Sequence, residues 1–310
     1  MALKKKGIDK KVFFYIALIA LPLLQFAIFY VYVNFNSFFL SLHEYNPKTY
    51  LYDFVGFDNF NEIFEELFMS DKSGQWATRL KNSLFNFSMT LVVGMVGALI
   101  FSYYIYKKKF LSEGFKIFLF VPHIIPSIAL FAIFKRFTDG GAVSFINNTL
   151  HLEHLGIDSL LTDPRYNYPV ILCFALFIGF GTQVMMYLGA MNKINPSITE
   201  AAELDGITFF REFWYITLPN VFPTIATFLV VSLTTFFTAD MGVFGMFGAG
   251  SQVPENIQTI GFQLHKLIVE ASNDATRWGN LSAFGLCCTF IVAPLSYFLK
   301  QYLDKVDPTM

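Results

Sequence analysis

The chain has 310 residues, of which 55% are hydrophobic, 18% aromatic and only 15% charged, and its formal net charge is −1. A soluble domain of this length could not bury so much apolar surface. The low polarity and the balanced charge also exclude a disordered chain and a nucleic-acid-binding protein. The composition therefore predicts a membrane protein.

Six stretches without charged residues are long enough to cross a bilayer, which takes about 20 apolar residues in a helix. They lie at 12–42, 82–106, 117–134, 166–192, 213–239 and 278–299. We therefore predict an all-α, polytopic membrane protein with six transmembrane helices. One membrane domain would cover 12–302, between an N-terminal segment at 1–11 and a tail at 303–310.

The first stretch and a seventh, shorter one each have a second interpretation. Lys4, Lys5 and Lys6 precede the first stretch, as in a secretory signal, but it is longer than a signal core and has no clear cleavage site. It is predicted to be a retained span. The stretch at 241–254 is short and rich in glycine, which favours a re-entrant or surface loop.

Lysine and arginine predict the orientation, because cytoplasmic loops retain positive charge. With the N-terminus inside the cell, the cytoplasmic segments are the N-terminus, 107–116, 193–212 and the chain from 300 on, which together hold 13 basic and eight acidic residues. The remaining segments hold nine basic and 15 acidic residues. Both termini are therefore predicted to be cytoplasmic, although Lys135 and Arg136 on the outer side count against this orientation.

Sequence motifs for catalysis and metal binding are missing. The phosphate-binding loop G-x-x-x-x-G-K-[ST] does not occur, so the chain is not expected to hydrolyse ATP. Cys173, Cys287 and Cys288 lie within apolar stretches without a CxxC pair, which indicates packing residues. The pair His43 and Glu44 lies at an outer membrane edge, which favours an interfacial role. We predict no enzymatic activity, and no metal or cofactor bound by this chain.

The loop between the fourth and fifth stretches carries the most specific pattern. It reads Glu200-Ala201-Ala202-Glu203-Leu204-Asp205-Gly206 and, after nine intervening residues, Ile216-Thr217-Leu218-Pro219. This pattern resembles the EAA loop, here 193–220, of the membrane subunits of binding-protein-dependent ABC importers. Softer landmarks resemble the carbohydrate, maltose-permease branch of that family: Asn59 with Phe60, Pro122, Pro126, and Asp163 with Pro164.

The resemblance implies a type I ABC importer permease fold with a cytoplasmic EAA coupling helix, in a bacterial plasma membrane. It implies import of a carbohydrate, expected to be an oligosaccharide, by alternating access; glycerol phosphate remains open. The implied partners are a second homologous permease, two cytoplasmic ATPase subunits holding ATP and Mg, and an extracellular solute-binding protein. The residues implied to couple to the ATPase are Glu200, Ala201, Ala202, Asp205, Gly206, Leu218 and Pro219.

Physical chemistry gives these loop residues a local role as well. Ser197 and Glu200 fit a capping box that would start a helix. Gly206 can take the left-handed conformation that ends one, and Pro219 can restart or kink a helix. Capping alone is the alternative to ATPase docking. A secondary transporter or channel would also fit the composition, but it would not explain the spacing of the pattern.

Polar residues within two of the stretches are candidates for a substrate path, because polar groups in hydrocarbon usually face a bundle interior or a cavity. Ser232, Thr235 and Thr238 would line one helix face in the fifth stretch, with Asp240 at its outer end. Gly179, Thr182 and Gln183 form a small polar patch in the fourth stretch. A ring such as Phe236 or Tyr187 could stack on a sugar. Helix packing is the alternative, since Ser, Thr and Gly commonly join membrane helices.

Overall fold

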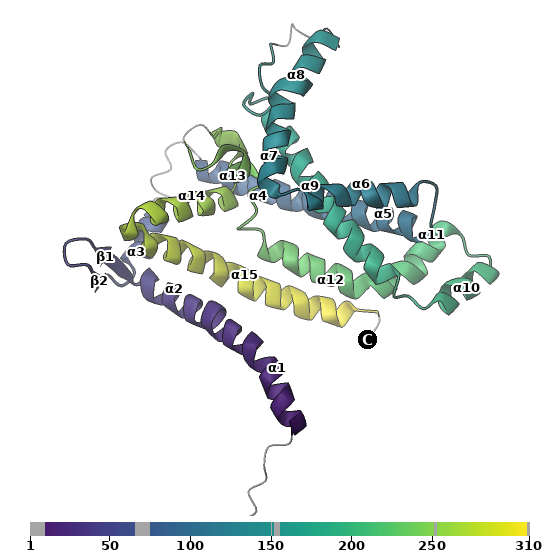
Figure 1. Ribbon diagram of the computed structural model, residues 1–310, viewed down its shortest axis with the longest axis horizontal. Helices are drawn as coiled ribbons and strands as arrows, with labels where there is room; N and C mark the ends of the chain where they lie inside the picture. The colour runs from purple at the N-terminus through teal and green to yellow at the C-terminus, as the bar shows by residue number, and fades with distance from the viewer. Residues whose placement is uncertain (1–9, 66–74, 150, 152–155, 251–252, 309–310) are drawn as a thin grey trace, which may run out of the picture. The chain divides into compact units, whose positions relative to one another are not determined.

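The computed structural model describes residues 10–65, 75–149, 151, 156–250 and 253–308, which are mostly helical (Figure 1). Residues 1–9 of the predicted N-terminal segment lie outside the described residues, as do parts of the two predicted outer loops. Contacts between residues divide the chain into two compact units. The first takes in the described residues up to 65 and Glu270–Cys287, and the second takes in those from 75 to Val269 and from Cys288 on.

The first unit begins with one long apolar helix and continues into a β-hairpin. Its elements are α1 (Lys10–Phe26), the π-helical turn η1 (Ala27–Tyr32), α2 (Val33–Ser41), β1 (His43–Asn46), β2 (Leu51–Phe54), α3 (Asp58–Phe64), η9 (Ala275–Arg277) and the first part of α15 (Trp278–Val306). The two strands are antiparallel, with His43 opposite Phe54. The buried Asn59 amide donates to the backbone oxygens of Ser41, at 2.9 Å, and His43, at 3.1 Å, which ties the hairpin to α3 and to the end of α2.

The second unit holds the remaining helices. They are α4 (Gln75–Met89), η3 (Thr90–Met95), α5 (Val96–Tyr106), α6 (Ser112–Ile124), α7 (Ser127–Arg136), η4 (Phe137–Gly141), α8 (Ala142–Ser144), η5 (Phe145–Thr149), α9 (Asn167–Met191), α10 (Pro196–Leu204), α11 (Phe209–Glu212), η7 (Phe213–Thr217), α12 (Leu218–Thr234), α13 (Val243–Phe247), η8 (Glu255–Ile257), most of α14 (Ile260–Asn273) and the rest of α15. α13 lies within the glycine-rich stretch 241–254 and is too short to span a bilayer.

Five helices in the described part of the chain are long and apolar enough to cross a membrane. They are Phe14–Ser41, Gln75–Tyr106, Asn167–Met191, Phe209–Thr234 and Ala275–Val306. Each overlaps a predicted span, so the prediction of a polytopic all-α fold is confirmed, with the hairpin as a local exception. The second and the last of these five helices extend beyond their predicted bounds, because helical structure continues through charged residues such as Arg79 and Lys305.

The third predicted span, 117–134, is broken in the structure. The chain forms α6 and then α7, and the two directions differ by 103° across the break. Pro126 explains the break, because it has no N–H to donate and it forces the preceding Ile125 into an extended conformation. The pair α6 and α7 is therefore a bent span or a re-entrant element, which brings the possible number of spans to six in the described chain.

The core of the second unit forms where α5, α6 and α9 pack together (Figure 1). The buried Ser102 hydroxyl donates to the Val184 backbone oxygen of α9, at 2.9 Å. A Cβ at Gly181 would clash with the backbone oxygen of Leu119, so only glycine allows α6 to come this close to α9. Small residues and a hydroxyl thus let these helices approach closely.

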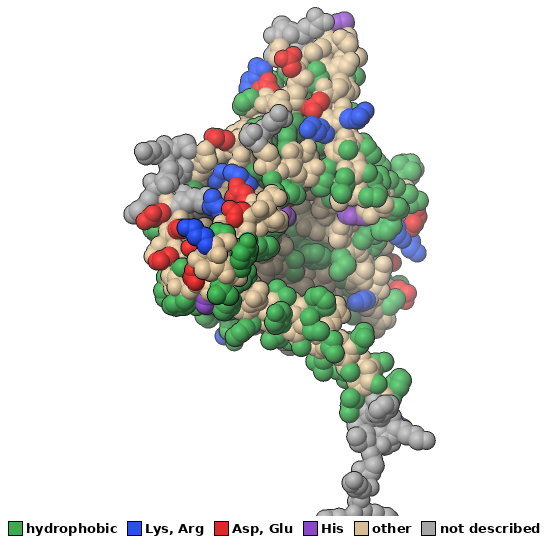
Figure 2. Space-filling model, turned by 60° about the vertical axis from the view of Figure 1, so that its left-hand side comes forward, with side chains coloured by type: hydrophobic (Ala, Val, Ile, Leu, Met, Phe, Trp, Pro, Cys, Tyr) green, Lys and Arg blue, Asp and Glu red, His purple; other side chains and the backbone are tan. Residues whose placement is uncertain are grey.

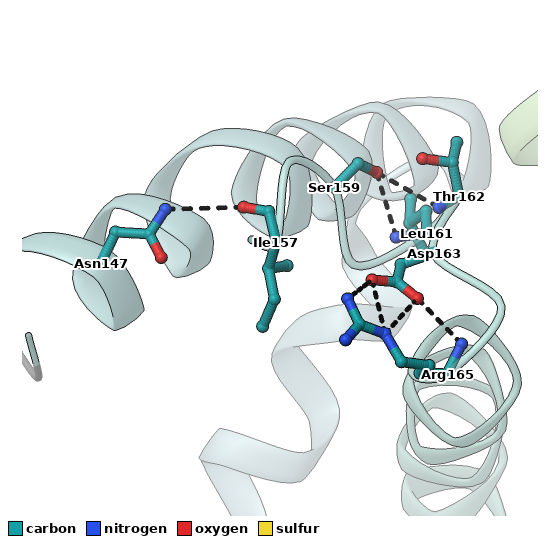
Figure 3. A network of polar contacts seen from close by, with 7 residues as sticks. All are labelled: Asn147, Ile157, Ser159, Leu161, Thr162, Asp163 and Arg165. Atoms are coloured by element: carbon teal, nitrogen blue, oxygen red, sulfur yellow. Dashed lines mark hydrogen bonds and ion pairs between the residues drawn. The ribbon is translucent and has the colours of Figure 1, made fainter. Parts of the chain in front are cut away.

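The start of α9 is fixed by two polar networks. In the loop before it, the Asp163 carboxylate accepts from the Arg165 backbone and guanidinium, with an ion pair of 2.6 Å, and the Ser159 hydroxyl accepts from two backbone N–H groups (Figure 3). Beside the helix itself, the Asn167 and Asn256 amides bond to each other at 2.7 and 3.0 Å. The Asn82 amide donates to the Asn256 and Gln258 backbone oxygens, which joins α4 to the segment around η8.

Many hydrophobic side chains are exposed, as expected for a protein surrounded by lipid. Hydrophobic side chains cover large continuous parts of the face shown in Figure 2, whereas charged side chains gather in a few clusters. The most apolar window of the first span has no buried residue within the structure. Its exposed rings and aliphatic side chains therefore suit contact with lipid or with another membrane helix.

Candidate functional site: the loop between α9 and α12

The helix that carries the EAA pattern, α10, begins two residues earlier than the predicted capping box would place it. Asn195 is its N-cap, with its side-chain oxygen accepting from the Ser197 backbone N–H at 3.1 Å, and Pro196 is the first helical residue. The predicted capping box of Ser197 and Glu200 is therefore wrong. Proline is well suited to the first helical position, so the pair Asn195-Pro196 fixes the start.

The end of α10 confirms the role predicted for Gly206. Its φ is +73°, in the left-handed region. The Gly206 N–H donates to the Glu203 oxygen and the Ile207 N–H to the Ala202 oxygen, each at 3.1 Å. This pair of bonds is the Schellman arrangement, which satisfies the last carbonyls of a helix. α10 is thus capped at both ends by residues within the loop itself.

α10 has one face packed inward and one face free. Thr199 and Ala202 are buried. The other pattern residues of the helix and its end are exposed: Glu200, Ala201, Asp205 and Gly206. Leu204, the last residue of α10, is 90% exposed, which is unusual for a leucine and adds an apolar side chain to the free face. The free face therefore presents two carboxylates beside an exposed leucine.

The second part of the pattern lies at the start of α12. Leu218 and Pro219 are half-buried and form its first turn, directly after the π-helical turn Phe213–Thr217. The helix runs without a break from Phe209 to Thr234, so Pro219 does not restart it. The wide turn next to Pro219 is consistent with the backbone bond that proline cannot make.

An ion-pair cluster beside α10 was not predicted from the sequence. The Lys107 ammonium lies 3.0 Å from Glu203 Oε1 and 2.6 Å from Glu212 Oε1. Burial disfavours the charged form of Lys107, but the hydrogen bonds to Glu212 and Glu203 outweigh this and raise its pKa above the ordinary value. Nearby, the Tyr103 hydroxyl donates to the Phe209 backbone oxygen at 3.0 Å. Nothing in the residue spacing links these side chains, which lie about 100 positions apart.

The candidate substrate residues of α9 differ in their exposure. Gly179 and Thr182 are exposed, and the Thr182 hydroxyl lies 3.2 Å from His123 Nε2 at the end of α6. Gln183 is half-buried, and its Oε1 atom is buried without a hydrogen-bond partner among the described residues. Tyr187 is fully buried and packs edge-on against Phe228, so it is part of the core.

The predicted hydroxyl face of the fifth span is wrong in its geometry. α12 ends at Thr234, so Thr235 is its C-cap, Thr238 lies beyond it in a turn, and only Ser232 remains within the helix. The Thr235 and Thr238 hydroxyls donate to the nearby Ser232 and Thr235 backbone oxygens, at 3.1 and 3.2 Å. Local bonding of this kind competes with helix continuation.

Asp240 has a structural partner of its own. Its two carboxylate oxygens accept from the Gly242 and Phe244 backbone N–H groups, each at 3.0 Å. The carboxylate thereby caps the first turn of α13 (Val243–Phe247), which packs on Phe131 of α7. The structure gives this residue a backbone-capping function in the loop after the fifth span.

Several long apolar helices, with a doubly capped and partly exposed helix between two of them, define a polytopic membrane protein. The family model described as "Binding-protein-dependent transport system inner membrane component" matches residues 76–310, and the chain belongs to this family. The resemblance found in the sequence is thereby confirmed. The chain is a transport component and not an enzyme.

Several curated proteins are similar over much of the chain. The multiple sugar-binding transport system permease protein MsmF of Streptococcus mutans is 25% identical over 92% of this chain and 93% of its own length. Protein LplB of Bacillus subtilis is 25% identical over 71% and 68%. The galactooligosaccharides transport system permease protein GanP of Bacillus subtilis is 26% identical over 69% and 51%.

Solved structures share the fold. A bacterial ABC transporter involved in the import of the acidic polysaccharide alginate contains a chain with a TM-score of 0.75 and 20% identity, covering 96% of this chain and 97% of that one. The same kind of transporter in complex with an alginate pentasaccharide-bound periplasmic protein gives a TM-score of 0.73 at 20% identity, with 98% and 99% covered. The predicted ABC importer permease fold is therefore confirmed.

Proposed function

We propose that this chain is a permease subunit of an ATP-driven importer that moves a carbohydrate, expected to be an oligosaccharide, across a bacterial plasma membrane by alternating access. The observation that carries the proposal is α10, a short helix fixed at both ends, whose free face includes Glu200, Ala201, Asp205 and Gly206. A preformed helix with an exposed face can enter a cleft of a partner without first being ordered, which lowers the cost of binding.

The carbohydrate assignment draws support from the similar proteins. Relatives named for sugars and galactooligosaccharides, and a structure with an alginate pentasaccharide on its periplasmic protein, all concern saccharides. The polar residues Gly179, Thr182 and Gln183 of α9 are the substrate-path candidates that remain on one helix. Hydroxyl and amide groups of this kind can exchange hydrogen bonds with sugar hydroxyls.

The proposed assembly contains a second homologous permease, two cytoplasmic ATPase subunits that bind ATP and Mg, and an extracellular solute-binding protein. In this arrangement both termini and the loop 193–220 face the cytoplasm. Single cysteines at positions 60 and 205, probed on intact cells with an impermeant thiol reagent, test the orientation. Labelling at 60 alone is expected, whereas labelling at 205 alone would reverse the topology.

The function itself is tested by purifying the chain from membranes with its co-purifying subunits and reconstituting the complex in liposomes. Uptake of a labelled oligosaccharide should require both ATP and the loaded binding protein. The same liposomes with a proton or sodium gradient and no ATP serve as the control. Uptake that follows the ion gradient and ignores ATP would make the protein a secondary transporter and overturn the proposal.

A further inference from the structure

Three charged side chains connect elements that are far apart in the sequence. Lys107 directly follows α5, Glu203 lies on α10, and Glu212 is the last residue of α11. The single Lys107 ammonium reaches both carboxylates, at 3.0 Å to Glu203 and 2.6 Å to Glu212. One side chain therefore links the end of a membrane helix to the helix of the EAA pattern and to the start of the next membrane helix.

The two arms of this cluster differ in strength because they differ in burial. The Glu212 side chain is only 4% exposed and that of Lys107 15%, whereas the Glu203 side chain is 64% exposed. A buried carboxylate needs a fixed opposite charge, since its desolvation is otherwise uncompensated. An exposed ion pair shifts an equilibrium by only about one- to fivefold. The Glu212 arm is thus permanent, and the Glu203 arm is weak enough to open and close.

A separate contact holds α11 on α5 without Lys107. The Tyr103 hydroxyl donates to the Phe209 backbone oxygen, and the two rings lie 4.6 Å apart. The Tyr103 ring also lies 5.0 Å from that of Phe213. α11 therefore has apolar and hydrogen-bonded contacts of its own, so opening the Glu203 arm would release α10 without releasing α11.

We propose that Lys107 is a positioning residue for α10: anchored by the buried Glu212, it holds Glu203 and so fixes the direction of α10 relative to the end of α5. This inference rests on the proposed function, in which α10 docks on an ATPase. Lys107 itself need not touch the ATPase. It sets the angle at which movement of α10 reaches the membrane helix α5, and the weak arm allows α10 to adjust as the ATPase closes.

The deciding variants separate positioning from direct docking. Glu203→Ala removes the weak arm and leaves the buried pair intact. Lys107→Met with Glu212→Gln removes the arm but keeps Glu203 and leaves no buried charge unpaired. Both should reduce the stimulation of ATP hydrolysis by loaded binding protein by up to about fivefold, the upper end of the range for one exposed ion pair. Lys107→Arg should retain the stimulation, because the guanidinium can bridge the same two carboxylates.

A matched control and a direct measurement of geometry complete the test. Glu113→Ala removes an exposed carboxylate at the start of α6, where it pairs with Lys116, and should leave stimulation unchanged. Spin labels at the exposed positions 110 and 204 report the distance between the turn that follows α5 and the end of α10. The distance distribution should broaden in Glu203→Ala and stay narrow in Glu113→Ala, which a loss of ATPase contact alone would not produce.

Each result decides one way. An unchanged distance distribution and unchanged stimulation in Glu203→Ala would overturn the positioning role, and this holds even if the double variant fails to assemble. Reduced stimulation in Glu203→Ala with normal stimulation in the double variant would mean that Glu203 contacts the ATPase directly, which also overturns it. A wild-type complex without binding-protein-stimulated hydrolysis would instead defeat the proposed function, while the distance measurement would still report on Lys107.

Discussion

Substitutions at Gly206 separate the backbone requirement of the coupling loop from its docking contacts. The residue has φ of +73°, and a Cβ added there would meet no atom within 4 Å. The cost of a side chain within this chain therefore comes from the backbone conformation alone. For most residues the left-handed conformation costs roughly 1–2 kcal/mol, with the larger values for β-branched side chains, whereas asparagine tolerates it.

The matched pair is Gly206→Asn and Gly206→Val, because the two side chains are similar in volume and differ in their tolerance of positive φ. Val should weaken the end of α10 by roughly 1–2 kcal/mol, and Asn by a few tenths. The amides of Gly206 and Ile207 donate the bonds that close the helix. Their hydrogen exchange should therefore speed up about 5- to 30-fold in the Val variant and hardly change in the Asn variant.

Association with the ATPase and uptake should follow the same order, with Val impaired and Asn close to wild type. Co-purification of the ATPase and ATP-dependent uptake in liposomes measure these two properties. If Asn and Val impair association equally while only Val changes the exchange rates, bulk at the docking face decides and the backbone argument fails. Wild-type association and stimulation in Gly206→Val would remove the coupling role from this loop, and the secondary-transporter alternative would move ahead.

Three further predictions follow from the contacts of single residues. Asn195→Ala should destabilise α10 by about 1 kcal/mol, seen as faster amide exchange in its first turn, while Ser197→Ala should have little effect; the reverse order would restore the capping box. Gly181→Ala should lower the melting temperature of the purified complex because α6 must move away from α9, whereas Gly179→Ala, with open space at its Cβ, should not. Gln183→Leu should lower uptake, because it removes an amide from the proposed substrate path. Normal uptake with a higher melting temperature would instead identify a packing residue, since the change removes a buried oxygen that has no hydrogen-bond partner among the described residues and so stabilises the protein by about 1 kcal/mol.

Local signals in the sequence predicted the parts of the fold that depend on neighbouring residues. The spans at 12–42 and 166–192 follow from charge-free length alone, and the end of α10 follows from a glycine after a helical stretch. The start of α10 was misplaced because two local caps compete, and the pair Asn195-Pro196 prevails over Ser197. The break in the third span lies at Pro126. This proline is one of the family landmarks, and its effect on a helix is also a local signal.

The contacts that depend on distant residues could not be predicted in this way. In the sequence, Lys107 is only one of the basic residues that predict the orientation in the membrane. In the structure it binds two carboxylates about 100 positions away. Asn82, Asn167 and Asn256 gave no signal, because an amide has no periodic pattern and their partners, backbone oxygens for Asn82 and each other's amides for Asn167 and Asn256, lie in distant segments. Long-range polar contacts of this kind become visible only once the helices are placed.

The coupling loop combines both kinds of information, and this has a consequence for how it can work. The caps of α10 are local, so the helix keeps its length and shape when it moves. Its attachment to α5 is long-range and includes one weak, exposed ion pair. A helix that keeps its shape can transmit displacement without unfolding, because opening one exposed ion pair costs less than losing the caps at both ends. Variants that unfold α10 should therefore abolish coupling to the ATPase. Variants that only remove the ion pair between α10 and the end of α5 should reduce coupling without abolishing it.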